Sequence, residues 1–342
     1  MPSRRTLLGR IGTAGVLGTT LAGIASGSAA GTARAADTIG STAPYDAGRL
    51  ADGDTVVTAV VDPAVVSAIG LPAPWSTRLS AAMARANVSL ADVDSIAGSA
   101  ALSETEREGA VVVRGSFDPD GLSAAVEDRG RWTTARSRRS GRPVRRFRGR
   151  GEPYAVAASD GMLVVGYAPA IDRAASHVDA AVERARAAGS LDGEPTDGAA
   201  AGDGSLPALQ SGDVAVHADI GESGRNRLRS ALSGGPETLR ASVEAAGSIG
   251  VALDVDGGGG GTDLRYAATL DPTRLTRDRV RRLSGGVDAE GALDDATVGF
   301  RGRTVVVDAT PTREDLFAVH DDLLSGGDGS PTDDDPADDD AD

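Results

Sequence analysis

The stretch SIAGSAALSETEREGAVVVRGSFDP, residues 95–119, has a counterpart of equal length in SIGVALDVDGGGGGTDLRYAATLDP, residues 248–272. Each consists of two runs rich in Ala, Val and other apolar residues around a polar or glycine-rich turn, SETEREG in one and DGGGGGTD in the other, which predicts a β-hairpin. Each also ends in Asp-Pro and is followed by a short helical pattern. Together with two further matches in the same order, this correspondence predicts that one fold occurs twice in the chain.

Two further pairs of segments extend the match on either side. The opening strands are expected at 54–62 and at 213–220, each followed by a helix, and a second hairpin is expected at 154–166 and at 296–307. Closing helices are expected at 170–188 and at 313–324. Each half is thus predicted to run β-α-ββ-α-ββ-α, a fold of the α+β class with antiparallel sheets and helices on one face. The sequence leaves open whether the halves pack sheet edge to sheet edge or helix layer to helix layer.

Composition divides the rest of the chain into segments. The stretch between the halves is rich in Gly, Asp and Pro, which is typical of a linker, and the C-terminal stretch SGGDGSPTDDDPADDDAD is low in apolar residues and predicted to be disordered. The predicted organisation is a signal peptide at 1–36, a polar leader at 37–53, the first half at 54–188, a linker at 189–212, the second half at 213–324 and an acidic tail at 325–342.

The N-terminus has the features of an export signal. Arg4 and Arg5 precede a weakly apolar run without acidic residues from 11 to about 31, and Ala33-Arg34-Ala35 supplies a cleavage site of the A-x-A type. Paired arginines favour the twin-arginine route, so the protein is expected outside the cell or at its surface. Cleavage of the signal and its retention as a tether both stay open. The chain has no cysteine, which excludes disulfides and a lipid-modified cysteine anchor, and no other segment is long and apolar enough to be expected to span a membrane.

The composition also indicates the solvent. Arginine supplies all 35 basic residues, Asp and Glu total 50, the formal net charge is −15 and only 3% of residues are aromatic. Such a charge destabilises a compact state unless salt screens it, and at 1 M salt the Debye length is only about 3 Å. An acidic surface over a core of small apolar side chains therefore predicts a protein adapted to brine. A GC-rich actinobacterial genome would explain arginine in place of lysine, but it explains the aspartate excess less well.

The order of these elements behind an export signal resembles that of haloarchaeal twin-arginine-exported proteins of unknown function. The resemblance rests on that order and on VVRGSFDP, residues 112–119, and DGMLVVGY, residues 160–167. It implies an exported protein with paired α+β halves. It implies no catalytic residue, because no active residues can be carried over from that family.

A basic cluster stands out against the acidic composition. Eight arginines follow the first predicted Asp-Pro helix: Arg136, Arg138, Arg139, Arg142, Arg145, Arg146, Arg148 and Arg150. The corresponding stretch of the second half, 284–295, is acidic instead. We interpret the arginines as partners of the protein's own carboxylates, in that stretch or in the tail, because short-range Arg–carboxylate pairs survive salt screening. A surface that binds a polyanion is the alternative, but eight phosphate contacts would weaken steeply in brine, so nucleic acid is not expected as a partner.

The chain offers few residues for catalysis. His177 and His320 fall in the closing helices and are expected to face solvent, while His217 falls in a strand. There is no phosphate-binding loop, dinucleotide fingerprint, H-E-x-x-H motif or G-x-S-x-G elbow. The aspartates around 254–263 lack the spacing of a calcium loop. We therefore expect no catalytic, cofactor or metal site, and interpret the protein as an exported, non-catalytic binding or structural component. An exported hydrolase with an unrecognised site and a polyanion-binding surface protein remain the alternatives.

Overall fold

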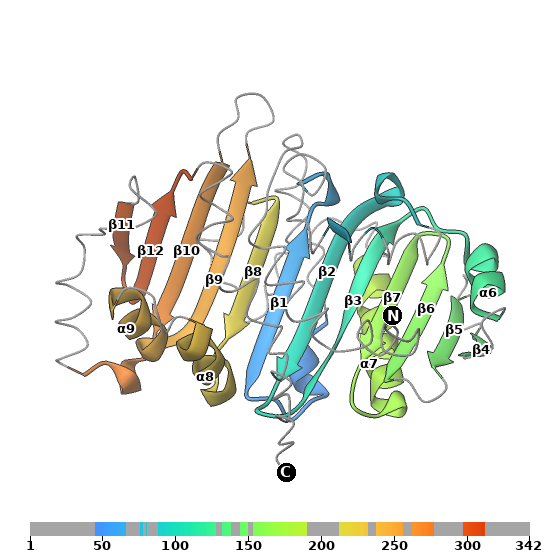
Figure 1. Cartoon of the computed structure of the whole chain (residues 1–342), viewed down its shortest axis with the longest axis horizontal. Coiled ribbons are helices and arrows are strands. Elements are labelled where there is room, and N and C mark those ends of the chain that lie inside the picture. The colour runs from blue at the N-terminus through green and yellow to red at the C-terminus, as the bar shows by residue number, and fades with distance from the viewer. Residues whose placement is uncertain are drawn as a thin grey trace, which may run out of the picture.

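The computed structural model describes residues 45–65, 76–77, 80, 88–127, 132–137, 144–149, 153–189, 212–231, 237–255, 262–276 and 297–311. These residues form one twelve-stranded antiparallel sheet, which Figure 1 shows from β11 at one edge to β4 at the other. The strand order is β11-β12-β10-β9-β8-β1-β2-β3-β7-β6-β5-β4. The α+β class with a large antiparallel sheet is as the sequence predicted.

The N-terminal half supplies seven strands and their connections. After the 3-10 helix η1 (Ala47–Arg49), its elements are β1 (Thr55–Val61), η2 (Leu90–Asp92), β2 (Val93–Leu102), β3 (Arg107–Gly115), α6 (Pro119–Glu127), β4 (Trp132–Ser137), β5 (Val144–Gly149), β6 (Tyr154–Ser159), β7 (Met162–Tyr167) and α7 (Ile171–Gly189). The hairpins β2–β3 and β6–β7 and the closing helix α7 lie where the sequence predicted them.

The C-terminal half supplies the other five strands. Its elements are β8 (Val214–Asp219), α8 (Glu222–Ala231), α9 (Glu237–Ala245), β9 (Ala246–Val255), β10 (Thr262–Leu270), η4 (Pro272–Arg274), β11 (Thr297–Arg301) and β12 (Thr304–Ala309). Of the helical pattern expected at 274–280, the structure describes residues 274–276; the 3-10 turn η4 ends at Arg274, and residues 277–280 lie outside the described residues. The linker, the expected closing helix at 313–324 and the acidic tail lie outside the described residues.

The two halves meet edge to edge. β1 pairs with β2 on one side and with β8 on the other, both antiparallel, so a single set of backbone hydrogen bonds crosses from one half to the other. The central ladder runs from Val56 opposite Asp219 to Val61 opposite Val214. Val61 and Val214 are fully buried. The packing that the sequence left open is therefore a continuous sheet.

Helices cover both faces of this sheet, which corrects the expectation of helices on one face. Directly paired residues of an antiparallel sheet point to the same face. When the pairs are followed from strand to strand across the sheet, the row that begins with Val164, under α7, ends with Asp308 of β12. Asp308 therefore points to the face that α7 covers. Val305, an odd number of residues from Asp308, points to the opposite face, where it packs with Ala241 and Ala245 of α9. A sheet buried on both faces needs apolar residues at successive positions, as the run of valines in β3 supplies.

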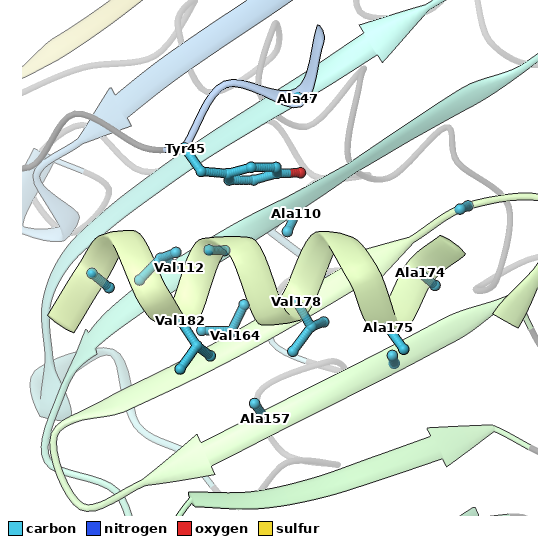
Figure 2. Packing of buried hydrophobic residues seen from close by; sticks show 14 of the residues in the cluster. Tyr45, Ala47, Ala110, Val112, Ala157, Val164, Ala174, Ala175, Val178 and Val182 are labelled. Atoms are coloured by element: carbon cyan, nitrogen blue, oxygen red, sulfur yellow. The ribbon is translucent and has the colours of Figure 1, made fainter. Parts of the chain in front are cut away.

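Small side chains let α7 lie close to the sheet. Figure 2 shows Val178 and Val182 of α7 packed over Val164 of β7, with Val112, Tyr45 and several alanines in the same layer. Gly166 of β7 marks the closest approach, since a Cβ there would lie 2.5 Å from the carbonyl oxygen of Ala174 and 2.6 Å from Val178. The layer between α7 and the sheet is thus built mainly from Ala, Gly and Val at short spacing.

Two segments differ from their predicted structure. The strands β4 and β5 form a hairpin within the arginine cluster, for which no strand was expected. Residues 45–51 belong to the core and not to a polar leader, because Tyr45, Ala47 and Ala51 are buried against the α7 layer. The backbone N–H of Ala47 also donates to Ser99 Oγ at 3.1 Å. The folded body therefore begins at least as early as Tyr45.

We predict that Gly166→Ala destabilises the protein by about 1–3 kcal/mol, because the added methyl group would push α7 off β7. Urea denaturation at fixed high salt measures this change. Gly299→Ala is the matched control, since Gly299 is also in a strand but no atom of the described residues lies within 4 Å of a Cβ built there. Equal stability of the two variants would show that α7 does not pack at this distance.

Candidate functional site

The arginine cluster is only partly described by the structure. Arg145, Arg146 and Arg148 lie in β5, and Arg136 lies in β4, where it pairs with Arg145 through the backbone. Arg138, Arg139, Arg142 and Arg150 lie outside the described residues. The site can therefore be built from the three side chains of β5.

Each arginine of β5 is paired with an aspartate of a neighbouring helix. Arg146 Nε donates to Asp179 Oδ1 at 2.8 Å and Arg148 Nη1 donates to Asp172 Oδ1 at 3.0 Å; both aspartates belong to α7. These partners come from the same half of the molecule. The acidic stretch at 284–295 and the tail, which the sequence offered as partners, lie outside the described residues.

The third arginine reaches the other face of the sheet. Arg145 forms an ion pair with Asp120 of α6, and its Nη1 donates to Ser123 Oγ at 2.8 Å. Because successive strand residues point to opposite faces, Arg145 faces α6 while Arg146 and Arg148 face α7. Between them, Phe147 is 1% exposed and anchors the strand. The strand is thus held on both faces by charge pairs and at its centre by an aromatic ring.

A buried polar chain under α7 is the second candidate site. Tyr45 Oη lies 2.8 Å from His177 Nδ1, and His177 Nε2 lies 3.1 Å from Glu108 Oε2. Tyr45, His177 and Glu108 are 6%, 1% and 4% exposed. Arg173, at the rim, donates to the other carboxylate oxygen of Glu108 and lies 3.9 Å from Glu106. The chain therefore links the core to the surface through four side chains.

The protonation states in this chain follow from burial. Loss of hydration lowers the pKa of His177 below its usual range, although hydrogen bonding to Glu108 opposes the shift. Burial likewise raises the pKa of the Tyr45 hydroxyl, and the charge of Glu108 adds to the increase. A neutral imidazole satisfies both contacts: Tyr45 donates to Nδ1, and Nε2–H donates to Glu108. The arrangement fixes Tyr45, and with it the start of the folded body, to β3 and α7.

The expectation that His177 faces solvent is wrong, and the pattern of α7 explains why. His177 is one helical turn from Ala174 and from Ala181, both of which are buried, so it shares their face. Glu108 likewise alternates with Ala110 and Val112 in β3. The periodicity of both elements contains this signal, but a single polar residue on an apolar face reveals its partner only after folding.

The other histidines do not join this site. His320 lies outside the described residues. His217 lies in β8; its Nε2 is buried without a hydrogen-bond partner, 3.8 Å from Asp219 Oδ1, and burial lowers its pKa. Among the described residues no serine hydrogen-bonds to it, as a Ser-His-Asp arrangement would require.

Asp213 is a buried carboxylate at the start of β8. Its Oδ2 accepts the backbone N–H of Val255 at 3.2 Å and its carbonyl oxygen accepts that of Asp62 at 2.8 Å. Burial raises the pKa of Asp213 to about 6, and the neighbouring charges of Asp254 and Asp62 add to the increase. Both contacts are to backbone groups, so they hold β1, β8 and β9 together at this end of the sheet.

In the part of the chain that the structure describes, no group of three or more His, Asp or Glu side chains could hold a metal ion. Within the same residues, no helix is long and apolar enough to cross a membrane. The fold and these contacts define a mixed α+β protein with one antiparallel sheet, in which the arginines of β5 are paired with aspartates of the neighbouring helices.

Comparison with known proteins adds a distant structural likeness. No protein-family model matches the chain, and no curated protein matches it significantly. Among solved structures, crystal forms III and I of TP0453 each give a TM-score of 0.45 at 12% identity, covering 84% of this chain and 97% of theirs. Crystal form IV of TP0453 gives 0.43 at 12% identity, over 82% of this chain and 98% of that one. At this similarity no residue role passes from TP0453 to this chain.

We predict that Tyr45→Phe destabilises the protein by about 1–3 kcal/mol, because the buried Nδ1 of His177 loses its donor. Tyr167→Phe is the control, since its hydroxyl forms no hydrogen bond among the described residues. Urea denaturation measures both variants, and the ¹⁵N shifts of His177 report the tautomer. Wild-type stability of Tyr45→Phe, or a proton on Nδ1 in the wild type, would contradict this assignment.

Proposed function

We propose that this protein is an exported, salt-adapted and non-catalytic component outside the cell, in which the arginine strand β5 serves as an internal clamp. The pairing of Arg145, Arg146 and Arg148 with aspartates of α6 and α7 is the observation that carries the proposal. Arginines whose guanidinium groups pair with aspartates of neighbouring helices stabilise the folded body. A surface that binds a polyanion instead needs its guanidinium groups directed at the ligand.

We further propose that the body arose by duplication of one half. The inner five strands of each half have the same order: β1-β2-β3-β7-β6 in one and β8-β9-β10-β12-β11 in the other. A strand irregularity also recurs, because one residue of β2, Asp94, and one of β9, Gly247, are left out of the pairing with the next strand. In each case the irregularity falls at the start of the hairpin whose sequence match first suggested the repeat.

Hydrogen bonds outside the regular ladders support the same equivalence. Ser116 N donates to Asp92 O at 2.8 Å, and Asp271 N donates to Ala245 O at 2.9 Å, immediately after β3 and β10. Likewise, Gly115 N donates to Gly161 O at 3.3 Å, and Leu270 N donates to Arg303 O at 2.9 Å, where each of these strands meets the turn of the next hairpin. If Asp94 of β2 is matched with Gly247 of β9, Ala59 in β1 becomes equivalent to Val216 in β8. These two equivalent residues are paired with each other at the centre of the β1–β8 ladder. The halves are thus related as the two subunits of a symmetric dimer.

Export and adaptation to salt rest on the sequence. The paired arginines, apolar run and A-x-A site favour twin-arginine export, and a net charge of −15 without lysine favours brine as the solvent. The anchoring of Tyr45 in the core is compatible with cleavage of the signal, because the predicted cleavage site near residue 35 precedes the first described buried side chain.

The internal clamp and the polyanion surface predict opposite results for Arg145→Gln, Arg146→Gln and Arg148→Gln combined. If the three arginines act as a clamp, the triple variant is less stable than the wild type by about 1–3 kcal/mol in 3 M NaCl, because each partly exposed pair contributes up to about 1 kcal/mol. The wild type then shows no retention on immobilised heparin at that salt concentration. Urea denaturation and heparin chromatography measure the two effects.

Arg49→Gln combined with Arg303→Gln is the control for these measurements, because both side chains are exposed. It is expected to leave stability within about 0.5 kcal/mol of wild type. Retention of the wild type on heparin at 2–4 M NaCl, lost in the triple variant but not in this control, would overturn the clamp and support the polyanion-binding alternative.

A further inference from the structure

The strand β11 forms one edge of the sheet and carries an exposed aromatic residue. Among the described residues it pairs with β12 alone. Phe300 in this strand is 57% exposed, and it and Leu50 are the large hydrophobic residues that the described part of the chain exposes. An edge strand with an exposed apolar side chain can add a strand from another chain, and proteins that remain monomeric usually block such edges.

The first half covers the equivalent edge. Its hairpin β6–β7 corresponds to β11–β12, since Ser159 pairs with Met162 as Arg301 pairs with Thr304, each across a two-residue turn. In that register Ala158 occupies the place of Phe300. Ala158 pairs with Arg145 of β5 and is completely buried. The first half thus continues with β5 and β4 where the described second half ends.

We propose that β11 pairs antiparallel with β11 of a second copy of this chain, so that one sheet runs through the dimer. A two-fold register centred on Gly299 places Phe300 opposite position 298 of the other copy, a valine, at both ends of the contact. Pairs of an aromatic and a β-branched residue are among the favourable cross-strand pairs.

The charges favour a second copy as the occupant. In the centred register Arg301 lies opposite Thr297 of the other copy, and Thr297 is itself paired with Asp308 of β12. The arginine therefore extends toward Asp308 of the other copy, a carboxylate that also pairs with Arg265 of its own chain, and not toward its own equivalent. The chain already joins its two halves by an antiparallel contact of this kind, centred on Ala59 and Val216. Because two bodies of net negative charge repel each other, the dimer is expected to strengthen with salt.

Cross-linking tests the register directly, since the chain has no cysteine of its own. In the full-length protein, Gly299→Cys is expected to form a disulfide-linked dimer on mild oxidation in 3 M NaCl, because paired strand residues lie at Cα distances of about 4.5–5.5 Å, which a disulfide can span. Leu50→Cys, at the other exposed apolar position, is the control and is expected to remain monomeric under the same conditions. Equal cross-linking of the two variants would overturn the proposal.

Sedimentation of untagged protein provides the second test. The wild type and Leu50→Lys are expected to be dimeric in 3 M NaCl, whereas Phe300→Lys raises the dissociation constant at least tenfold with an unchanged circular dichroism spectrum. A monomeric wild type, or an equally dimeric Phe300→Lys, would overturn the proposal. Hydrogen exchange at β11 tests whether another part of the same chain covers this edge. In that case the β11 amides would be protected to the same degree at every protein concentration, and this result would also overturn the proposal.

Discussion

The antiparallel ladder between β1 and β8 is the contact on which the rest of the structure depends. It turns two sets of strands into one sheet, and side chains at its ends reinforce it. Thr55 Oγ1 accepts the backbone N–H groups of Gly221 and Gly224, both at 3.0 Å, so a residue of the first half caps helix α8 of the second. A Cβ at Gly221 would lie 2.2 Å from Asp54 O, which leaves glycine as the residue that fits this junction. The two halves therefore share structure at their boundary.

The charge pairs at the edge of the sheet formed by the first half depend on the small side chains of the core. With few aromatic residues, the body packs through Ala, Gly and Val, whose short reach brings helices near the strands. Close helices place aspartates such as Asp172 and Asp179 over the arginines of β5. At high salt, pairs at contact distance lose less of their attraction than long-range repulsion loses of its strength. The acidic composition and the arginine strand are thus compatible with the proposed adaptation to salt.

The sequence predicted the hairpins and α7 because each has a strong period of its own. It missed β4 and β5, since in VRRFRG four charged or small residues surround Phe147 and only the neighbouring helices neutralise the arginines. It misplaced His177, whose polar character outweighed the apolar face that it shares. The edge-to-edge packing was undetermined for another reason: β1 reads TVVTAVV, which predicts burial on both faces but not which strand lies beside it.

Native-state hydrogen exchange of the protein in 3 M NaCl tests the single-sheet account most directly. The account predicts that amides of β1, β3, β8 and β10 reach the same free energy of opening, that of global unfolding, because the β1–β8 ladder couples both halves into one cooperative unit. Exchange of β8 and β10 at a distinctly lower free energy, while β1 and β3 stay protected, would mean that the halves unfold independently and would contradict it.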